Sequence, residues 1–316
     1  MPRNVASDGW VFVDPANQTR PREFRRNVWT MFDPVRPLSG VSVLLIGGNM
    51  DIQNHDEIRA QVRTAYSNVA KGQDGCSVGC CGSRNGASRQ LGYTDEDLAT
   101  VPAGADLGLG CGNPQAIAAL HEGETVLDLG CGAGFDCLLA SKRVGSTGTV
   151  IGVDMTAEMV VRARENARKV GAANVDIRLG EIEHLPVADA CVDVIMSNCV
   201  INLSPDKAAV FGEAIRVLKP GGRLAISDVI TTRPLPAALA ESLQALTGCV
   251  AGSVDAATLR AMMIHAGFAD VRIEPIEGSR DTIQQCMPGA EDYVASATIE
   301  GRRPAADCCS SECCSE

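Results

Sequence analysis

The sequence is poor in aromatic residues and histidine, and it contains no long apolar segment. Aromatics make up 3% of the 316 residues and histidine occurs four times. A β-sandwich built on aromatic cross-strand pairs is therefore disfavoured. No run of about 18 apolar residues is present, which argues against a membrane-spanning helix. The N-terminal segment lacks the charged-then-apolar layout of a secretory signal, so we expect a cytoplasmic protein.

Positive charge is also scarce. The chain has 28 Lys and Arg against 39 Asp and Glu, a formal charge of −11. This balance gives no basic surface for a phosphate backbone or an anionic membrane. We therefore expect a small-molecule substrate and neither nucleic acid nor membrane as partner.

Cysteine is present 14 times but never as C-x-x-C. The signatures of zinc ribbons and thioredoxin-type redox sites are thus missing. The cysteine content is also well below the roughly 8–10% that marks a small secreted disulfide scaffold. In a reducing compartment these side chains should be mostly thiols that serve as ligands, nucleophiles or core residues.

The centre of the chain alternates between strand and helix patterns. A buried strand is predicted over 125–130, and further strands over 149–155, 175–180, 191–198 and 223–230, with helices over 134–145, 156–171 and 205–222. Such alternation predicts an α/β fold with a doubly wound, Rossmann-like parallel sheet. We expect an N-terminal extension of unknown role (1–55), the main domain (56–232), a smaller C-terminal lid or substrate subdomain (233–300) and a disordered cysteine-rich tail (301–316).

A glycine loop follows the first predicted strand, in LDLGCGAGFD. Gly130, Gly132 and Gly134 let the backbone turn sharply and approach a ligand closely. Asp154 ends the next strand about 20 residues later, where an acidic residue can bind a ribose. The spacing is G-x-G-x-G with Asp128 before it, which resembles motif I of the S-adenosylmethionine-dependent methyltransferases. The alternative for the loop is a plain tight turn, with Asp128 as its cap.

The resemblance implies an S-adenosylmethionine site in the class I methyltransferase fold. GEIEHLP, after the third strand, resembles the adenine-edge loop of that class, with Glu181 and Ile182 as contacts. We expect the cofactor-binding residues to be Asp128, Gly130, Gly132, Gly134, Asp154, Met155, Glu181, Ile182 and Asn198.

Three cysteines lie in separate segments that can reach the top of one crevice. Cys199 follows the fourth predicted strand, Cys111 lies just before the sheet, and Cys249 lies just beyond it. Three converging thiolates suit a trivalent, thiophilic metalloid that forms three pyramidal bonds and keeps a lone pair. Trivalent arsenic is the leading candidate.

Longer strings carry a more specific resemblance. DLGLGCGNP, GETVLDLGCGAGFDC, VIGVDMT, RLGEIEHLPV, SNCVINLSPDK and RVLKPGGRLAISDV resemble the arsenite methyltransferases, which methylate As(III) with S-adenosylmethionine. The resemblance spans residues 56–280. It implies that Cys111, Cys199 and Cys249 bind arsenic, that the C-terminal subdomain contributes to this binding, and that the methylated arsenicals serve detoxification.

The resemblance further implies a fourth cysteine that forms a disulfide with Cys111 during turnover. Cys76, Cys80 and Cys81 are the candidates, and we favour Cys80 or Cys81. A thiol reductant, thioredoxin or glutathione, would then reset the enzyme. The tail cysteines either capture metalloid or belong to a tolerated disordered end. Core packing is the simpler interpretation for Cys131, Cys137 and Cys191.

Two other functions remain open from the residues alone. A methyltransferase acting on a quinone-like carbon acceptor would share the sheet and the glycine loop, but it would leave Cys111, Cys199 and Cys249 unexplained. A thiol-rich metalloid-binding protein could retain the fold without the activity. An assay for methyl transfer to arsenite would distinguish both alternatives from an arsenite methyltransferase.

Overall fold

The computed structural model describes residues 52–72 and 87–305. Almost all of the predicted extension lies outside the described residues, as do the candidate cysteines Cys76, Cys80 and Cys81. The four tail cysteines, Cys308, Cys309, Cys313 and Cys314, also lie outside them.

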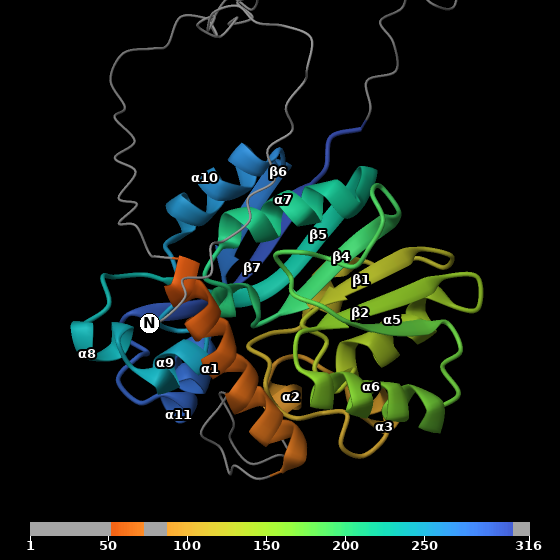
Figure 1. The fold of residues 1–316 in the computed structure, drawn as a ribbon, viewed down its shortest axis with the longest axis horizontal. Coiled ribbons are helices and arrows are strands. Elements are labelled where there is room, and N and C mark those ends of the chain that lie inside the picture. Colours follow the sequence, from red (N-terminus) through yellow and green to blue (C-terminus); the bar gives the residue numbers. More distant parts are fainter. Residues whose placement is uncertain (1–51, 73–86, 306–316) are drawn as a thin grey trace, which may run out of the picture. The chain divides into compact units, whose positions relative to one another are not determined.

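A seven-stranded sheet forms the centre of the described chain, in the order β3-β2-β1-β4-β5-β7-β6 (Figure 1). Strands β1 to β5 pair in parallel, and β7 joins β5 and β6 antiparallel. The strand bounds are β1 Thr125–Leu129, β2 Thr149–Asp154, β3 Val175–Leu179, β4 Val192–Asn198, β5 Leu218–Thr231, β6 Ala269–Pro275 and β7 Val294–Arg302. The predicted doubly wound α/β fold is confirmed.

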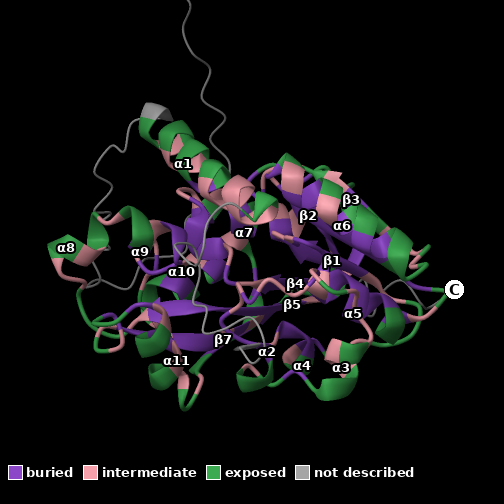
Figure 2. Cartoon of the chain, turned by 90° about the horizontal axis from the view of Figure 1, so that it is seen from below, coloured by how far each residue is buried: buried purple, intermediate pink, exposed green. Residues whose placement is uncertain are grey.

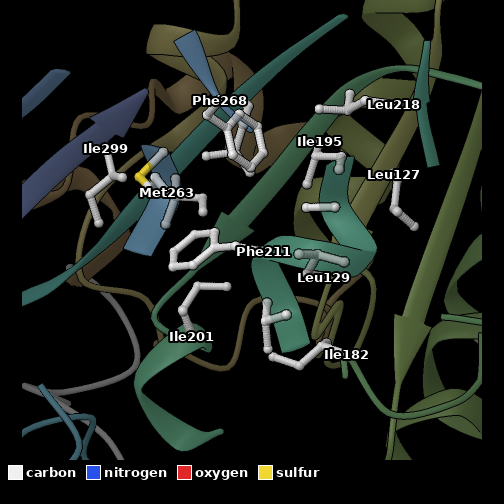
Figure 3. Packing of buried hydrophobic residues seen from close by; sticks show 14 of the residues in the cluster. Leu127, Leu129, Ile182, Ile195, Ile201, Phe211, Leu218, Met263, Phe268 and Ile299 are labelled. Atoms are coloured by element: carbon white, nitrogen blue, oxygen red, sulfur yellow. The ribbon is translucent and has the colours of Figure 1, made fainter. Parts of the chain in front are cut away.

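Alternate residues of the central strands enter two different cores. Val126 of β1 packs with α5 (Phe135–Val144) and α6 (Ala157–Lys169) on one face. Leu127 packs on the other face with α7 (Lys207–Val217) and α10 (Ala256–Ala266). Figure 3 shows this second core, in which Phe211 of α7 lies among residues such as Leu129 and Ile201. Because helices cover both faces, the central strands are almost continuously apolar, as in other parallel sheets.

The C-terminal part of the chain extends the same sheet. After β5 come α8 (Ala237–Ala240), α9 (Leu243–Thr247), α10, β6, α11 (Ser279–Cys286) and β7. Strand β7 pairs with β5 from Arg223↔Arg302 to Thr231↔Val294. The boundary at residue 232 stays a prediction, but the two parts share one continuous hydrogen-bonded sheet.

Helix α1 (Ile52–Lys71) packs beside α6 and α9 (Figure 1). Ile58, Val62 and Tyr66 recur on one face and contact a third apolar cluster, whereas its opposite face is exposed (Figure 2). The remaining short helices are α2 (Ala87–Gln90), α3 (Asp95–Ala99), α4 (Pro114–Ala118) and the 3₁₀ turn η1 (Ile201–Leu203). Within residues 52–72 and 87–305, no helix is long and apolar enough to cross a bilayer.

Candidate active site

A cavity opens at the carboxyl ends of β1, β2 and β4, where open parallel sheets bind ligands. Seven of the predicted cofactor residues line it, namely Asp128, Gly130, Gly132, Asp154, Met155, Ile182 and Asn198. Gly134 and Glu181 are described but lie outside this lining. Cys199 also lines the cavity, so a predicted thiol ligand and the predicted cofactor residues share one site.

The glycine loop has the left-handed backbone that glycine tolerates best. Gly130 has φ 67°, and a Cβ there would lie 2.5 Å from the Val200 side chain. Gly132 has φ 52°, and a Cβ there would meet nothing within 4 Å. The loop therefore leaves open space above Gly132 while its first glycine lies tightly against the chain after β4.

Gly134 has another role in this structure. It is the N-cap of α5, with φ 87°, and a Cβ there would lie 3.2 Å from the Cβ of Ala163. The third glycine thus allows α5 to pack closely against α6, which explains its place outside the cavity lining.

Asp154 and Asp128 are buried carboxyl groups on the cavity wall. Asp154 accepts hydrogen bonds from the Gly132 amide at 2.9 Å and the Thr156 amide at 2.8 Å, which ties the ends of β1 and β2 together. Asp128 accepts from the Cys137 thiol at 3.2 Å. Burial raises the pKa of both carboxyl groups.

A network that the sequence analysis missed joins the cavity to the Cys111 loop. Tyr93 donates to Asp136 at 2.8 Å, and the Asn198 side chain donates to the Tyr93 hydroxyl at 3.2 Å and to Gly112 O at 2.8 Å. The Asn198 side-chain oxygen accepts from the Cys111 amide at 3.0 Å. Asp136 could have been suspected because it follows the glycine loop directly. Tyr93 gave no such signal.

The structure brings Cys111, Cys199 and Cys249 together. They come from the loop before α4, the end of β4 and the turn after α9, and are only 3%, 6% and 1% exposed. The Cys111 and Cys249 side chains both hydrogen-bond to the Cys199 thiol. The Cys249 thiol also lies 2.7 Å from the Cys199 carbonyl oxygen. We refer to these three residues as the thiol cluster.

Two members of the thiol cluster have strained backbones. Cys199 has φ 59° and Cys249 has φ 63°, in the left-handed region that non-glycine residues rarely adopt. Each such residue costs on the order of 1–2 kcal/mol. Backbone strain of this kind concentrates at functional sites, because the surrounding fold must hold it in place.

The Cys199 and Cys249 thiols of the cluster have pKa values shifted in opposite directions. Hydrogen bonds from Cys111 and Cys249 hold the pKa of the Cys199 thiol well below its ordinary value, despite burial. The pKa of Cys249 is raised by its hydrogen bond to Cys199 and by burial. Cys199 therefore ionises more readily than Cys249, and a thiolate is the form that attacks or ligates a soft centre.

Two buried charged residues beside the thiol cluster were also missed. Asp228 lies on β5. One of its carboxylate oxygens and the sulfurs of Cys111 and Cys199 all lie within 4.8 Å of one another. Burial and the charge of Cys199 raise the pKa of Asp228 to about 8. Burial lowers the pKa of Lys207, which interacts with Asp228 and Cys249. The sequence signal available for Asp228 was an acidic residue inside a predicted strand.

Helix α1 closes one side of the cavity. Arg59, Val62 and Tyr66 line it, and the Arg59 guanidinium lies 3.3 Å from the Glu183 carboxylate. Glu181, a predicted cofactor contact, instead pairs with Arg63 at 3.0 Å. Glu183, which the sequence analysis did not select, lines the cavity and accepts from the Ser204 hydroxyl at 2.6 Å.

The other described cysteines lie outside the thiol cluster. Cys131 and Cys137 are buried in the core between the sheet, α5 and α6, although Cys131 also lines the cavity. Cys191 is half-buried, with its thiol 3.0 Å from Ala188 O. Cys286 is half-buried at the end of α11.

Comparisons with known proteins identify the family of the chain. A family model described as a methyltransferase domain matches residues 120–269. The chain is 52% identical over 266 residues to an arsenite methyltransferase from Halobacterium salinarum, covering 80% of this chain and 68% of that protein. It is 39% identical over 211 residues to an arsenite methyltransferase from Aquipseudomonas alcaligenes, covering 63% of this chain and 60% of that protein.

A solved structure of an arsenic methyltransferase is also similar to this chain. The crystal structure of CrArsM, an arsenic(III) S-adenosylmethionine methyltransferase from Chlamydomonas reinhardtii, matches with a TM-score of 0.52 and 34% identity, covering 70% of this chain and 74% of that one. The glycine loop and the cavity at the carboxyl ends of the strands are the features expected of a methyltransferase, and the similarity to these proteins indicates the same class. The chain therefore belongs to the arsenite methyltransferase family and is an S-adenosylmethionine-dependent methyltransferase.

Proposed function

We propose that this enzyme transfers methyl groups from S-adenosylmethionine to trivalent arsenic bound by Cys111, Cys199 and Cys249. The observation that carries the proposal is the convergence of three buried thiols, from three separate segments, beside the cavity. Sulfur ligands suit a soft, thiophilic centre, and three of them match the three bonds of As(III). Methylated arsenicals formed in this way would serve detoxification.

The cavity residues fit S-adenosylmethionine, which supplies an electrophilic methyl group on a positively charged sulfur. The open space above Gly132 leaves room for a ligand close to the backbone. Asp154 is placed to meet a ribose, since it ends β2 beside the glycine loop. Met155 and Ile182 offer apolar contacts for a flat base, and Asn198 lies between the cavity and the Cys111 loop.

The thiol cluster would load arsenic by ligand exchange. Arsenite, or its conjugate with a small thiol, would exchange onto Cys199 first, because its lowered pKa favours the thiolate form. Cys111 and Cys249 would follow, each passing its proton to a departing oxygen or sulfur group. Arsenic would then retain its lone pair. The fixed backbones of Cys199 and Cys249 hold the sulfurs in place, which favours an in-line attack on the methyl carbon.

Methyl transfer makes arsenic formally pentavalent, so two electrons must return it to the trivalent state. We assign these electrons to the formation of a disulfide between Cys111 and Cys80 or Cys81. The second thiol attacks the arsenic-bound Cys111 sulfur and loses its proton, and the electron pair of the broken As–S bond returns to arsenic. Cys80 and Cys81 lie outside the described residues. A dithiol reductant such as thioredoxin, or glutathione, would then reduce the disulfide.

The test is arsenic speciation after incubation of the purified protein with labelled S-adenosylmethionine, arsenite and a thiol reductant. We expect methylated arsenic from the wild type and a drop of about 100-fold in Cys199→Ser, since a displaced ligand misplaces the reacting atom. Cys191→Ser is the matched control, because Cys191 lies outside the thiol cluster.

Full activity in Cys199→Ser would contradict the proposed thiol site. Binding of S-adenosylmethionine without methylation of arsenite would contradict the proposed substrate. It would favour a carbon acceptor or a metalloid-binding protein instead.

A further inference from the structure

The buried carboxyl group of Asp228 has no part in the mechanism above. We propose that Asp228 is a fourth protein group of the arsenic site, whose carboxylate stabilises the positive charge that methyl transfer places on arsenic. This inference rests on the proposed arsenic methylation and adds a catalytic residue to it.

The position of Asp228 supports this role. One of its carboxylate oxygens and the sulfurs of Cys111 and Cys199 all lie within 4.8 Å of one another. In the described ranges, no other three side chains of metal-ligating type are grouped so closely. Asp228 is 1% exposed, so no bulk water lies between the carboxylate and the thiol cluster. An atom bound to both sulfurs would therefore be close to the carboxylate.

The carboxylate is also held rigidly. Its Oδ1 accepts from the Asn202 side-chain amide at 2.8 Å and the Val229 amide at 2.7 Å, and its Oδ2 accepts from the Asn202 amide at 3.3 Å. These hydrogen bonds stabilise the charged form, and the negative charge of Cys199, which contributes to the raised pKa of Asp228, is removed once Cys199 binds arsenic. A rigid charge needs no reorganisation when the reaction begins, and such preorganised groups provide much of the rate enhancement in enzymes.

The reaction creates a positive charge close to this carboxylate. The arsenic lone pair forms the As–C bond, the methyl–sulfur bond breaks, and its electron pair stays on the leaving sulfur. The positive charge of the sulfonium is thereby lost, and arsenic, with three thiolate ligands and one methyl group, gains it. In a buried site this charge interacts with fixed protein charges far more strongly than in water.

Lys207 places a second positive charge near the thiol cluster, which increases the need for the Asp228 carboxylate when arsenic becomes positive. Its ammonium group donates to Ser204 O at 3.2 Å and interacts with Asp228, Cys249 and Glu183. Without Asp228, the arsenic cation would lose the carboxylate that lies with the Cys111 and Cys199 sulfurs, while the Lys207 ammonium group would remain nearby. The loss of Asp228 should therefore slow methyl transfer more than it weakens the binding of neutral, thiolate-bound arsenic.

The test compares the wild type with Asp228→Asn, which preserves shape and can still accept from Asn202 and Val229. We expect the single-turnover rate of arsenite methylation to fall about 10- to 100-fold, near the range for removal of one preorganised electrostatic group. Dissociation constants for arsenite and S-adenosylmethionine should stay within about threefold, a change of at most ~0.7 kcal/mol. Asp189→Asn, in the exposed loop before β4, is the matched control.

A second variant separates the charge from the fold. In Asp228→Ala, added formate should restore part of the single-turnover rate, whereas neutral formamide of the same shape should not. A rate in Asp228→Asn within threefold of the wild type would overturn the proposal. So would parallel losses of rate and arsenite affinity, or failure of formate to exceed formamide. Absence of arsenite methylation by the wild type would instead overturn the proposed function itself.

Discussion

At the scale of single residues, the thiol cluster combines reactive chemistry with backbone strain. Hydrogen bonds from two neighbouring thiols lower the pKa of the buried Cys199 thiol, and its φ of 59° is unfavourable for any side chain with a Cβ. A glycine would relieve this strain but would have no thiol. The site therefore retains cysteine at a cost in stability, as strained functional residues commonly do.

This strain gives a measurable prediction for two substitutions of one residue. Cys199→Gly should be more stable to urea than Cys199→Ala by about 1 kcal/mol, because glycine adopts the left-handed region freely. Both variants should lose arsenite methylation. The free energy of unfolding, taken from urea titrations of both proteins, is the measurement. Equal stability of the two variants would show that the backbone at residue 199 relaxes when the sulfur is removed.

At the scale of secondary-structure elements, α1 covers one side of the cavity and is attached by side chains. Arg59 reaches the buried Glu183, Tyr66 donates to Thr247 O at 3.2 Å, and Arg162 of α6 donates to Ala70 O at 3.0 Å. These contacts join α1 to elements more than 90 positions away in the sequence. Because Arg59, Val62 and Tyr66 line the cavity, the position of α1 should affect cofactor binding.

Arg59 and Arg63 form a matched pair for testing this effect. Arg59→Met removes the partner of a buried carboxylate, and we expect about a tenfold loss of S-adenosylmethionine affinity, equivalent to ~1.4 kcal/mol. Arg63→Met removes only a half-exposed ion pair with Glu181, so affinity should change less than twofold. Calorimetric titration with the cofactor provides the measurement. Equal effects of the two substitutions would mean that α1 does not act through Glu183.

At the scale of the whole molecule, the sheet holds distant parts of the chain together. The segment before β1 is bound to β5, where Arg223 forms two parallel hydrogen bonds to Glu124, at 2.6 and 2.9 Å. Burial raises the pKa of Glu124, but hydrogen bonds from Arg223 and the His121 amide outweigh it, so the pKa lies below its ordinary value of 4.5. A carboxylate with a lowered pKa stabilises the fold above its unfolded-state pKa and loses this effect in acid.

We therefore expect the stability lost in Glu124→Gln to depend on pH. Near pH 7 the variant should be less stable than the wild type by about 1 kcal/mol, a value reduced for solvent screening of this partly exposed pair. The difference should shrink as the pH falls below 4.5, because Glu124 of the wild type becomes protonated there. Urea titrations at pH 7 and pH 3 measure it. A difference independent of pH would indicate a packing effect rather than an ionic one.

The periodicity of the sequence predicts much of this architecture. The five parallel strands and the helices between them follow from short apolar runs separated by turn residues, because a sheet covered on both faces needs such runs. Strands β6 and β7 appear in the sequence only as short strand-like runs. Their antiparallel addition to β5 could not be predicted, since it depends on which sheet edge the chain meets after α10 and α11.

The glycine loop and the residue types of the candidate site were determined by the sequence, because local turns and soft ligands need particular amino acids. Tertiary structure decided which of these residues meet. It places Glu183 rather than Glu181 at the cavity, and arginines of α1 pair with both carboxylates. It also brings Asp228 to the sulfurs of Cys111 and Cys199. The sequence around Asp228 does not indicate this contact, because the cysteines come from distant segments that meet Asp228 only in the folded chain.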